Sequence, residues 1–538
     1  MSDCEREKNY RRILILFGMV FLIFSGFLVR LIIIQLVDYP SYSHLAANQR
    51  QGLLLKNTLR GDFFDRHGKI IRGSEKAWYL LIEKLNLNSV RSEKISHELK
   101  PILGNQFVTA LSQNREQSFW IYPEPLNELQ IKQILTLHQP ECKILANSIR
   151  RDQHQGIAQH LLGFADQERG FSGLEYFFQS RLRSQDNSGL VFTLNDGKQH
   201  FFPGLGIRAQ NAFNSHGVIL TIDRRIQQIV EQIMDAHQIP GAIVILDAKN
   251  GQILAMSSRP MVDFFVETSS NQDHPFINRA ISAYHPGSIF KLVSLSAGLD
   301  SGILNPKEYF YDTSQGGQGF VSLTEALAYS CNSVFIQIAM RLQPKLILEY
   351  ADRFGLGQLC NIGLPNESWG KLPSGIGLSD GEIANLALGQ QDVYTTPLQI
   401  ASMVQTIANG GIRCTPRLVL GTSDSKGAVT VINQITPVPS VRVITEATAQ
   451  TIKDMMAAVV TYGTGMAAQL QEGTAGKTGT AQVDDDPKTP SHAWFAGFTP
   501  LKVPKFITVV FCEQGLSGAE TAAPIFKEVM EKVTRIGD

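Results

Sequence analysis

A long apolar run near the N-terminus limits what this chain can fold into. Residues 13–29 contain no charged side chain, and after Arg30 the apolar run resumes over residues 31–37. A stretch of this length can cross a bilayer as one tilted helix, with Arg30 near enough to one end to reach the interface. The alternatives are a cleaved signal peptide and a buried core helix. The run is too long for the apolar part of a signal peptide, and no small-residue cleavage pattern follows it closely. We therefore expect a transmembrane anchor over residues 13–37.

The charges beside this run predict its orientation. Lysine or arginine occupies positions 6, 8, 11 and 12, whereas a comparable stretch after the run contains only Arg50 and Lys56. Short segments rich in Lys and Arg stay on the cytoplasmic side. We expect residues 1–12 to form a cytoplasmic tail and everything after about residue 38 to be exported.

Composition excludes several classes of function. The 49 basic residues balance the 49 acidic ones, so nothing predicts a nucleic-acid surface. Export would leave five cysteines in an oxidising compartment, an odd number without C-x-x-C or other metal-ligand spacing. We interpret them as mostly buried small side chains, and we expect no metal and no cofactor. The five are Cys142, Cys331, Cys360, Cys414 and Cys512.

Beyond the anchor, the sequence divides near residue 210. Residues 38–210 mix short apolar and polar runs and show no catalytic constellation; their histidines, including His154, His160 and His200, lack ligand spacing. Residues 211–538 begin with a strand and an amphipathic helix (217–234) and a hairpin (241–258) that turns at Asn250-Gly251. Helical segments are expected over 288–470, and strands return at 473–483, 493–498 and 505–515. A sheet built from both ends of a domain with helices between predicts an α/β sandwich.

The sequence "YHPGSIFK" places Ser288 three residues before Lys291 at the start of an apolar helix. Ser-x-x-Lys also occurs at Ser368/Lys371 and Ser423/Lys426, but both lie in segments rich in helix breakers. On a helix, a spacing of three puts both side chains on one face. The structural alternative is that Ser288 caps the helix and that Lys291 extends its amine to solvent.

In the catalytic alternative, Ser288 is the nucleophile and Lys291 is the base that activates it. A lysine in an apolar pocket can have its pKa lowered enough to take the proton of a serine hydroxyl. The helix N-terminus would direct backbone N–H groups at the oxyanion that forms when Ser288 attacks a carbonyl.

Two later motifs favour the catalytic interpretation. "YSCNSVF" contains Ser330-x-Asn332, and "AGKTGTAQV" contains Lys477-Thr478-Gly479, which occurs only once. An ammonium group and hydroxyls beside a glycine on a strand suit a carboxylate, because Gly479 would leave room for the substrate backbone.

In this order the three motifs resemble the signature set of class A β-lactamases and penicillin-binding proteins. Further segments resemble class B penicillin-binding proteins, which are monofunctional peptidoglycan D,D-transpeptidases of bacterial division or elongation. Departures from that family are His285, Ile289, Gln391 and a short interval between Ser288 and Ser330. The resembling segments are "RGDFFDRHGK" (60–69), "GFSGLEYFF" (170–178), "NRAISAYHPGSIFKL" (278–292), "LGQQDVYTTPLQIASMVQTIANGG" (388–411), "YGTG" (462–465) and "HAWFAGFTP" (492–500).

This resemblance implies a transpeptidase domain over residues 211–538, with the serine β-lactamase-like sandwich of a sheet between helices. It also implies an elongated α+β pedestal over 38–210 and an anchor in the bacterial inner membrane, with the catalytic domain on the periplasmic side. Ser288 would attack the penultimate D-Ala of stem peptides ending D-Ala-D-Ala, with Lys291 as base. Ser330 would pass the proton to the departing D-Ala, and Asn332 would hold substrate and lysine.

The resemblance also assigns substrate binding and partners. Lys477, Thr478 and Thr480 would bind the terminal carboxylate, and backbone N–H groups of Ser288 and Thr480 would form the oxyanion hole. β-Lactams would bind covalently, and a membrane glycan polymerase within the division or elongation complex would be a partner. The alternatives are a β-lactamase and a non-catalytic envelope scaffold. The Glu-x-x-x-Asn pattern of class A β-lactamases is not found between the second and third motifs, because Glu382 and Asn385 are one residue too close; this argues against a β-lactamase. The presence of all three motifs argues against a non-catalytic scaffold.

Overall fold

The computed structural model divides the chain into two compact units. The first unit contains Met1–Asn57, Ala77–Asn147 and Asn187–Ala212, and the second contains Thr58–Lys76, Ser148–Asp186 and Phe213–Asp538. The second unit therefore includes two segments from within residues 38–210. The division into a pedestal (38–210) and a transpeptidase domain (211–538) stays a prediction. The structure describes residues 3–39, 42, 51–56, 60–83, 89–113, 119–150, 156–165, 169–183, 190–194, 207–209, 216–238, 240–261, 276–314, 316–423, 429–430, 440–482 and 489–537.

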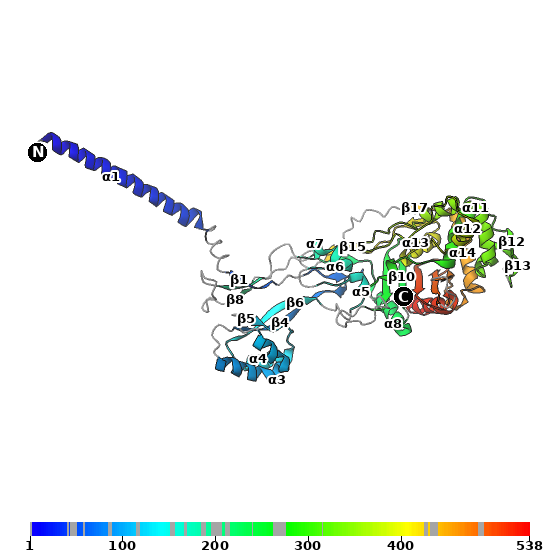
Figure 1. Cartoon of the computed structure of the whole chain (residues 1–538), viewed down its shortest axis with the longest axis horizontal. Helices are drawn as coiled ribbons and strands as arrows, with labels where there is room; N and C mark the ends of the chain where they lie inside the picture. Colours follow the sequence, from blue (N-terminus) through cyan, green and yellow to red (C-terminus); the bar gives the residue numbers. More distant parts are fainter. Residues whose placement is uncertain are drawn as a thin grey trace. The chain divides into compact units, whose positions relative to one another are not determined.

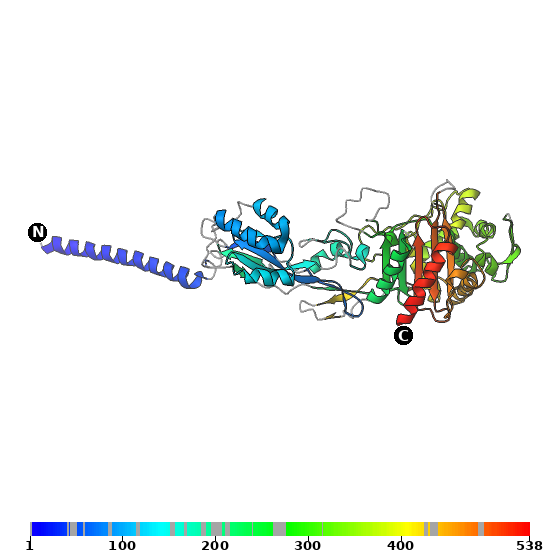
Figure 2. The same cartoon turned by 90° about the horizontal axis from the view of Figure 1, so that it is seen from below.

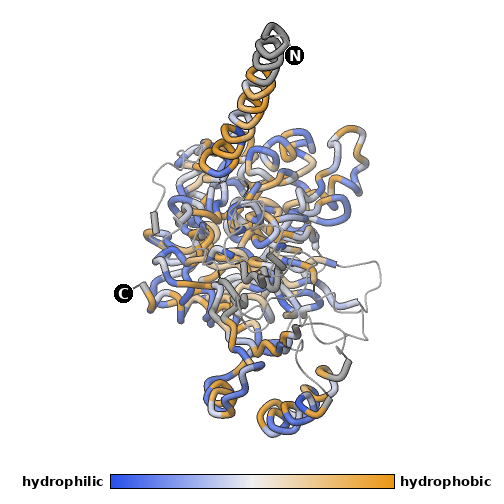
Figure 3. Tube along the Cα trace, turned by 90° about the vertical axis from the view of Figure 1, so that its left-hand side faces the viewer, coloured by the Kyte–Doolittle hydropathy of each residue, from blue (hydrophilic) through white to orange (hydrophobic). Residues whose placement is uncertain are grey.

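The N-terminal apolar run forms one continuous helical segment. Helix α1 (Asp3–Ile32) continues into a π-helical turn, Ile33–Val37, and Leu14–Val37 has a mean hydropathy of 2.5 with none of the stretch buried in protein. Figure 3, which colours the Cα trace by residue hydropathy, shows much of this helix in the orange of hydrophobic residues. An exposed helix of this length and composition is stable in a lipid environment and unfavourable in water. It fits a single membrane anchor and agrees with the predicted span, although the helix begins earlier, at Asp3.

The rest of the first unit is an α+β arrangement around a small core. One sheet has the order β1-β7-β8 and another the order β5-β4-β6. The second sheet packs its apolar side chains, among them Leu80 and Trp120, against Leu99 and Phe107 of α3. The elements are β1 (Gln51–Lys56), β4 (Ser74–Glu83), α3 (Ser89–Gln113), β5 (Phe119–Ile121), α4 (Glu128–Thr136), β6 (Cys142–Arg150), β7 (Leu190–Leu194) and β8 (Ile207–Ala209).

A five-stranded antiparallel sheet organises the second unit. Its order is β11-β10-β20-β19-β18, so the chain supplies two strands before the helices and three after them. The predicted hairpin and the three later strands are confirmed, with Gly251 alone taking the positive φ of the turn, 67°. The strands are β10 (Gly241–Asp247), β11 (Ile253–Arg259), β18 (Ala475–Ala481), β19 (His492–Thr499) and β20 (Phe506–Cys512).

Alternating side chains bury both faces of this sheet. Ala242, Val244 and Leu246 of β10 join one apolar cluster, whereas Ile243 and Ile245 join the other. Because successive strand residues point to opposite faces, helices must cover both. Helices α8 (Arg224–His237) and α15 (Ala523–Thr534) cover one face, where Figure 2 shows α15 in red. Helices α9 (Lys291–Asp300) and α13 (Pro397–Ala408) belong to the cluster on the other face. The predicted α/β sandwich is confirmed.

The interval 288–470 is helical only in part, so this prediction was wrong in places. The labels in Figure 1 show strands β12, β13 and β17 among its helices. Each of these short strands is paired with a partner strand, and this pairing stabilises the extended backbone. The helices are α10 (Leu323–Ala328), α11 (Asn332–Arg353), α12 (Asp380–Leu388) and α14 (Glu446–Thr461), with 3-10 turns at Gly287–Phe290 (η3) and Met466–Ala468; the strands are β12 (Tyr309–Asp312), β13 (Gly319–Ser322), β14 (Ile412–Cys414), β15 (Val419–Ser423), β16 (Val429–Thr430) and β17 (Ser440–Arg442).

The segment "RGDFFDRHGK" is built into the second unit. Its strand β2 (Phe63–Phe64) pairs in parallel with β9 (Val218–Leu220) in a sheet of order β16-β15-β9-β2-β3, where β3 is Ile70–Arg72. The short helices α5 (Gln159–Leu162), α6 (Gly173–Phe177) and α7 (Gln179–Leu182) belong to the same unit.

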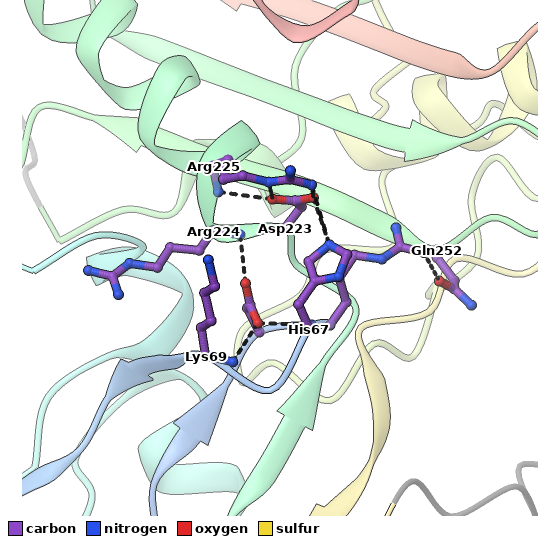
Figure 4. Close-up of polar contacts among 8 residues, drawn as sticks. His67, Lys69, Asp223, Arg224, Arg225 and Gln252 are labelled. Carbon is purple, nitrogen blue, oxygen red and sulfur yellow. Dashed lines mark hydrogen bonds and ion pairs between the residues drawn. The ribbon is translucent and has the colours of Figure 1, made fainter. Parts of the chain in front are cut away.

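A polar cluster joins this segment to the start of α8. Figure 4 shows Asp223 between His67, whose Nε2 lies 3.1 Å from Oδ2, and Arg225, whose guanidinium lies 2.8 Å from the same oxygen. Burial raises the pKa of Asp223, but hydrogen bonds from Arg225 and His67 outweigh burial and lower the pKa to about 2. The side chain of Asp223 also caps α8 through the backbone N–H of Arg225.

A buried ion pair connects two of the resembling segments. Arg60 Nε donates to Glu175 Oε2 at 3.0 Å, and both side chains are almost completely buried. Arg72, also buried, lies 4.0 Å from the other carboxylate oxygen of Glu175. The carboxylate of Glu175 therefore lies close to two buried arginine side chains.

Replacing Glu175 by Gln should destabilise the second unit strongly. The change removes the negative charge that lies within 4.0 Å of both buried arginines, and breaking a buried ion pair costs about 3–5 kcal/mol of unfolding free energy. The measurement is thermal unfolding of full-length protein in detergent. Glu308→Gln is the matched control, because its pair with Arg341 is partly exposed and is worth less than about 1 kcal/mol. Equal effects of the two substitutions would contradict this interpretation.

Candidate active site

Ser288 and Lys291 lie on one continuous turn. Ser288 belongs to the 3-10 turn η3, and Lys291 is the first residue of α9. In a 3-10 turn the side chains at i and i+3 eclipse each other, so both face the same side. Pro286 and Phe290 cap the two elements without a side-chain hydrogen bond, and Lys291 is fully buried. The structural alternative, a capping serine and a solvent-reaching lysine, is therefore wrong.

The Lys291 amine is held by the second motif. Its Nζ donates to Ser330 O at 2.8 Å, to Ser330 Oγ at 3.1 Å and to Asn332 Oδ1 at 2.6 Å. The ring of Phe335 lies 5.3 Å from the same nitrogen. Burial lowers the pKa of Lys291 to about 7, against smaller opposing effects of Cys331 and Asp312. An amine with this pKa is substantially neutral at physiological pH and can accept a proton.

Ser330 links the two lysines of the site. Lys477 Nζ, on β18, donates to Ser330 Oγ at 3.0 Å and to Thr478 O at 3.0 Å. Ser330 has a φ of 59°, which is unfavourable for a non-glycine residue and turns both its carbonyl and its hydroxyl towards Lys291. Within the described part of the chain, neither ammonium group forms an ion pair with a carboxylate. Burial and the charge of Lys291 lower the pKa of Lys477 well below its usual value.

The remaining residues of the third motif line the edge of the sheet. Thr478 Oγ1 lies 2.7 Å from Thr464 Oγ1, and Thr480 is exposed, with its Oγ1 accepting from the backbone N–H of Gly518 at 3.3 Å. β18 pairs with β19 on one side only, since it is the last strand of the sheet order. An edge strand of this kind can bind an extended peptide.

Two glycines bring the edge strand and the Ser288 turn together. A Cβ on Gly479 would lie 2.8 Å from Pro286 O and 3.2 Å from Ile289 Cγ1. A Cβ on Gly287, which has a φ of 59°, would lie 2.6 Å from Thr480 O. The turn that carries Ser288 therefore lies against Gly479, and the predicted room for the substrate backbone stays a prediction.

Sequence reasoning missed several residues of this site. Thr464 lies in the "YGTG" segment, to which the resemblance assigned no role. Phe335 and Gly287 carried no signal beyond their neighbourhood. Asp312 precedes a turn rich in serine and glycine, a pattern that indicates only local hydrogen bonding.

The other two Ser-x-x-Lys sequences serve structural roles. Lys371 is exposed and pairs with Asp392 at 2.6 Å, and Ser368 Oγ accepts from the N–H of Gly370. Ser423 ends strand β15, where a loop was expected, and accepts from the N–H of Gly217; Lys426 lies outside the described residues.

Two further sequence observations have structural explanations. Gln391, which stands where the resembling family has glycine, adopts a φ of 57°, the left-handed backbone that glycine favours. The carboxylate of Glu382 accepts from the N–H and hydroxyl of Ser379 in a capping box, which is a structural role for the helix.

Among the described residues, the cysteines are free thiols and no candidate metal site is present. Cys331, Cys360, Cys414 and Cys512 are buried free thiols, and Cys142 is partly buried, in agreement with the predicted small side chains. No group of three or more His, Cys, Asp or Glu among the described residues could hold a metal ion.

Comparison with known proteins agrees with this geometry. The family described as "Penicillin binding protein transpeptidase domain" matches residues 241–531, which contain all three motifs. The chain belongs to the penicillin-binding protein transpeptidase family. Its fold class and the enzyme class predicted from the sequence are thereby confirmed.

Relatives of this penicillin-binding protein span most of its length. It is 30% identical to "Penicillin-binding protein PbpB" of Mycolicibacterium smegmatis over 82% of this chain and 73% of that protein. It is 29% identical to "Stage V sporulation protein D" of Bacillus subtilis over 96% of this chain and 84% of that protein. The crystal structure of the D,D-transpeptidase domain of a peptidoglycan glycosyltransferase from Eggerthella lenta matches with a TM-score of 0.65 at 20% identity, covering 90% of this chain and 99% of that one.

Acylation of this penicillin-binding protein by a β-lactam should depend on pH near neutrality. The basic form of Lys291 accumulates as pH rises through about 7, so the acylation rate should rise between pH 6 and pH 8. Stopped-flow measurement of the second-order rate constant checks this. Lys291→Arg should abolish the rise and reduce the rate by about 100-fold or more, whereas Lys477→Arg should keep the rise. A flat profile in the wild-type enzyme would contradict the role of Lys291.

Proposed function

We propose that this enzyme cross-links peptidoglycan stem peptides through an acyl-enzyme on Ser288. The observation that carries the proposal is the buried Lys291 amine, bound to Ser330 and Asn332 and one turn from Ser288. Two of its relatives bear names that agree with this activity, since the MrdA proteins of Acinetobacter baumannii and Haemophilus influenzae are each named peptidoglycan D,D-transpeptidase.

The first half of the reaction forms the acyl-enzyme. Neutral Lys291 takes the proton of Ser288 as the hydroxyl oxygen bonds to the carbonyl carbon of the penultimate D-Ala. Backbone N–H groups of Ser288 and Thr480 stabilise the oxyanion. As the peptide bond breaks, Ser330 passes a proton to the amine of the leaving D-Ala, and the hydroxyl position between two lysines suits this transfer.

Substrate binding changes the charge of the site. Lys477 lacks an acidic partner among the described residues, and burial disfavours its charged form. The terminal carboxylate of a stem peptide would supply that partner, with Thr478 and Thr480 as additional donors. Binding would therefore favour the charged form of Lys477 while Lys291 remains available as the base. Gly479 keeps the edge strand next to the nucleophile.

The second half transfers the acyl group to an amine of a neighbouring stem peptide. The amine attacks the ester carbonyl, its proton leaves through the same groups, and Ser288 is regenerated with a new peptide cross-link. A β-lactam, which mimics D-Ala-D-Ala, would enter the first half and remain bound as a stable acyl-enzyme.

We further propose that residues 1–12 are cytoplasmic and that the site lies on the outer side of the bacterial inner membrane. The Lys and Arg residues before the apolar run support this orientation. A separate membrane glycan polymerase of the division or elongation machinery would supply glycan strands, because no polymerase motif was found in residues 38–210.

Penicillin labelling tests the nucleophile and the orientation together. Full-length protein should form a long-lived covalent adduct with fluorescent penicillin, and Ser288→Ala should form none. Ser368→Ala, in a structural Ser-x-x-Lys sequence, is the matched control and should label normally. Intact spheroplasts should label with a penicillin that does not cross the inner membrane.

Each alternative function predicts a different outcome of this experiment. A β-lactamase would release hydrolysed drug within minutes, and a non-catalytic scaffold would not label. Mass spectrometry that maps the adduct outside Ser288 would refute the site, and labelling only after lysis would refute the orientation.

A further inference from the structure

A buried carboxylate lies behind the second motif. Asp312, the last residue of β12, is 6% exposed. Its Oδ1 accepts from Ser333 Oγ at 2.6 Å and from the hydroxyl and N–H of Ser314 at 2.7 and 3.1 Å. Its Oδ2 accepts from the N–H of Gln318 at 3.3 Å. Hydrogen bonds from Ser333 and Ser314 lower the pKa of Asp312, so it is charged at physiological pH.

Asp312 reaches the catalytic amine through the start of α11. Ser333 directly follows Asn332, whose side chain accepts from Lys291. Ser333 Oγ also accepts from the N–H of Thr313 at 3.0 Å, so the hydroxyl ties the end of β12 to the first turn of the helix. A displacement of Asp312 would therefore move Asn332 and its contact with Lys291.

Burial and nearby charge act in opposite directions on the pKa of Lys291. Burial disfavours the charged amine, and the charge of Lys291 in turn lowers the pKa of Lys477 on β18. Cys331 lies beside Asp312, and burial raises the pKa of its thiol to about 11, so the thiol is neutral at pH 7. Asp312 is therefore the group that carries a negative charge at neutral pH among the described groups that act on Lys291. This charge raises the pKa of Lys291 because it stabilises the protonated amine.

We propose that Asp312 is a positioning residue for acylation, which holds Asn332 through Ser333 and whose negative charge keeps Lys291 basic enough to take the proton of Ser288. The inference rests on the proposed role of Lys291 as the base. Without this charge, burial would leave a Lys291 amine that is neutral over a wider pH range but is a weaker proton acceptor.

The test compares variants that separate the charge of Asp312 from its hydrogen bonds. Asp312→Asn removes the charge and keeps the size of the side chain. Ser333→Ala keeps the charge and removes the shortest hydrogen bond. The second-order acylation rate constant is measured with one β-lactam from pH 5.5 to 9 on full-length protein, with the thermal midpoint recorded for each variant.

Asp312→Asn should move the rising part of the profile to lower pH. The ratio of the rate at pH 6 to that at pH 8 should increase about 2.5-fold, as expected when the midpoint falls by about half a unit from about 7, while the plateau rate falls. Ser333→Ala should lower the plateau without moving the midpoint. Equal losses at every pH in both variants, without a shift, would show a purely structural role and overturn the proposal.

Two controls keep the result decisive. If Asp312→Asn does not fold, Asp312→Glu and Ser333→Ala both retain the charge, so both must keep the wild-type midpoint, and a shift in either overturns the proposal. A wild-type profile without a rising part, or a fully active Lys291→Arg enzyme, would refute Lys291 as base. A normal wild-type profile with an unshifted Asp312→Asn variant refutes only the role of Asp312.

Discussion

The Ser330 hydroxyl, which accepts hydrogen bonds from two buried lysines, is the interaction on which the rest of the site depends. It places Lys291 and Lys477 around one oxygen although each disfavours the charge of the other. The left-handed backbone at Ser330 is the conformational cost of this arrangement, about 1–2 kcal/mol. The surrounding packing of α9, α11 and β18 must hold this strained residue in place.

The fold meets this requirement with parts from distant regions of the chain. The turn that carries Ser288 precedes a buried helix, the Ser330 hydroxyl comes from the turn before α11, and Lys477 comes from an edge strand more than 140 residues after Ser330. Gly479 and Gly287 permit the strand and the turn to approach closely. The sheet can hold this geometry because both of its faces are buried by helices.

The sequence could predict which residues form this site, but it could not predict all of the contacts that hold them together. The spacing of Ser288 and Lys291 and the apolar neighbours of Lys291 predicted a buried amine on the same turn as Ser288, and its burial is confirmed. The resemblance to class B penicillin-binding proteins brought Ser330, Asn332 and Lys477 into the site, which local spacing alone could not do. The close approach of Gly479 to the turn that carries Ser288 was not predicted, because a contact between segments so far apart in the sequence has no local signal. The strands between 309 and 442 were missed for a similar reason, since pairing with a partner strand, rather than local propensity, stabilises short extended segments. The electrostatic effect of Asp312 on Lys291 was missed for the same reason, because it depends on tertiary structure and has no local sequence signal.

The charge state of Lys291 is the central claim, and it can be observed directly. Protein labelled with ¹³C at the lysine Cε carbons, with the Lys291 signal assigned from Lys291→Arg, should show a resonance that titrates with a midpoint near pH 7 in the substrate-free enzyme. A neutral, buried amine at the pH of catalysis is the result that this account predicts. A Lys291 resonance that remains in its charged position up to pH 10 would contradict it.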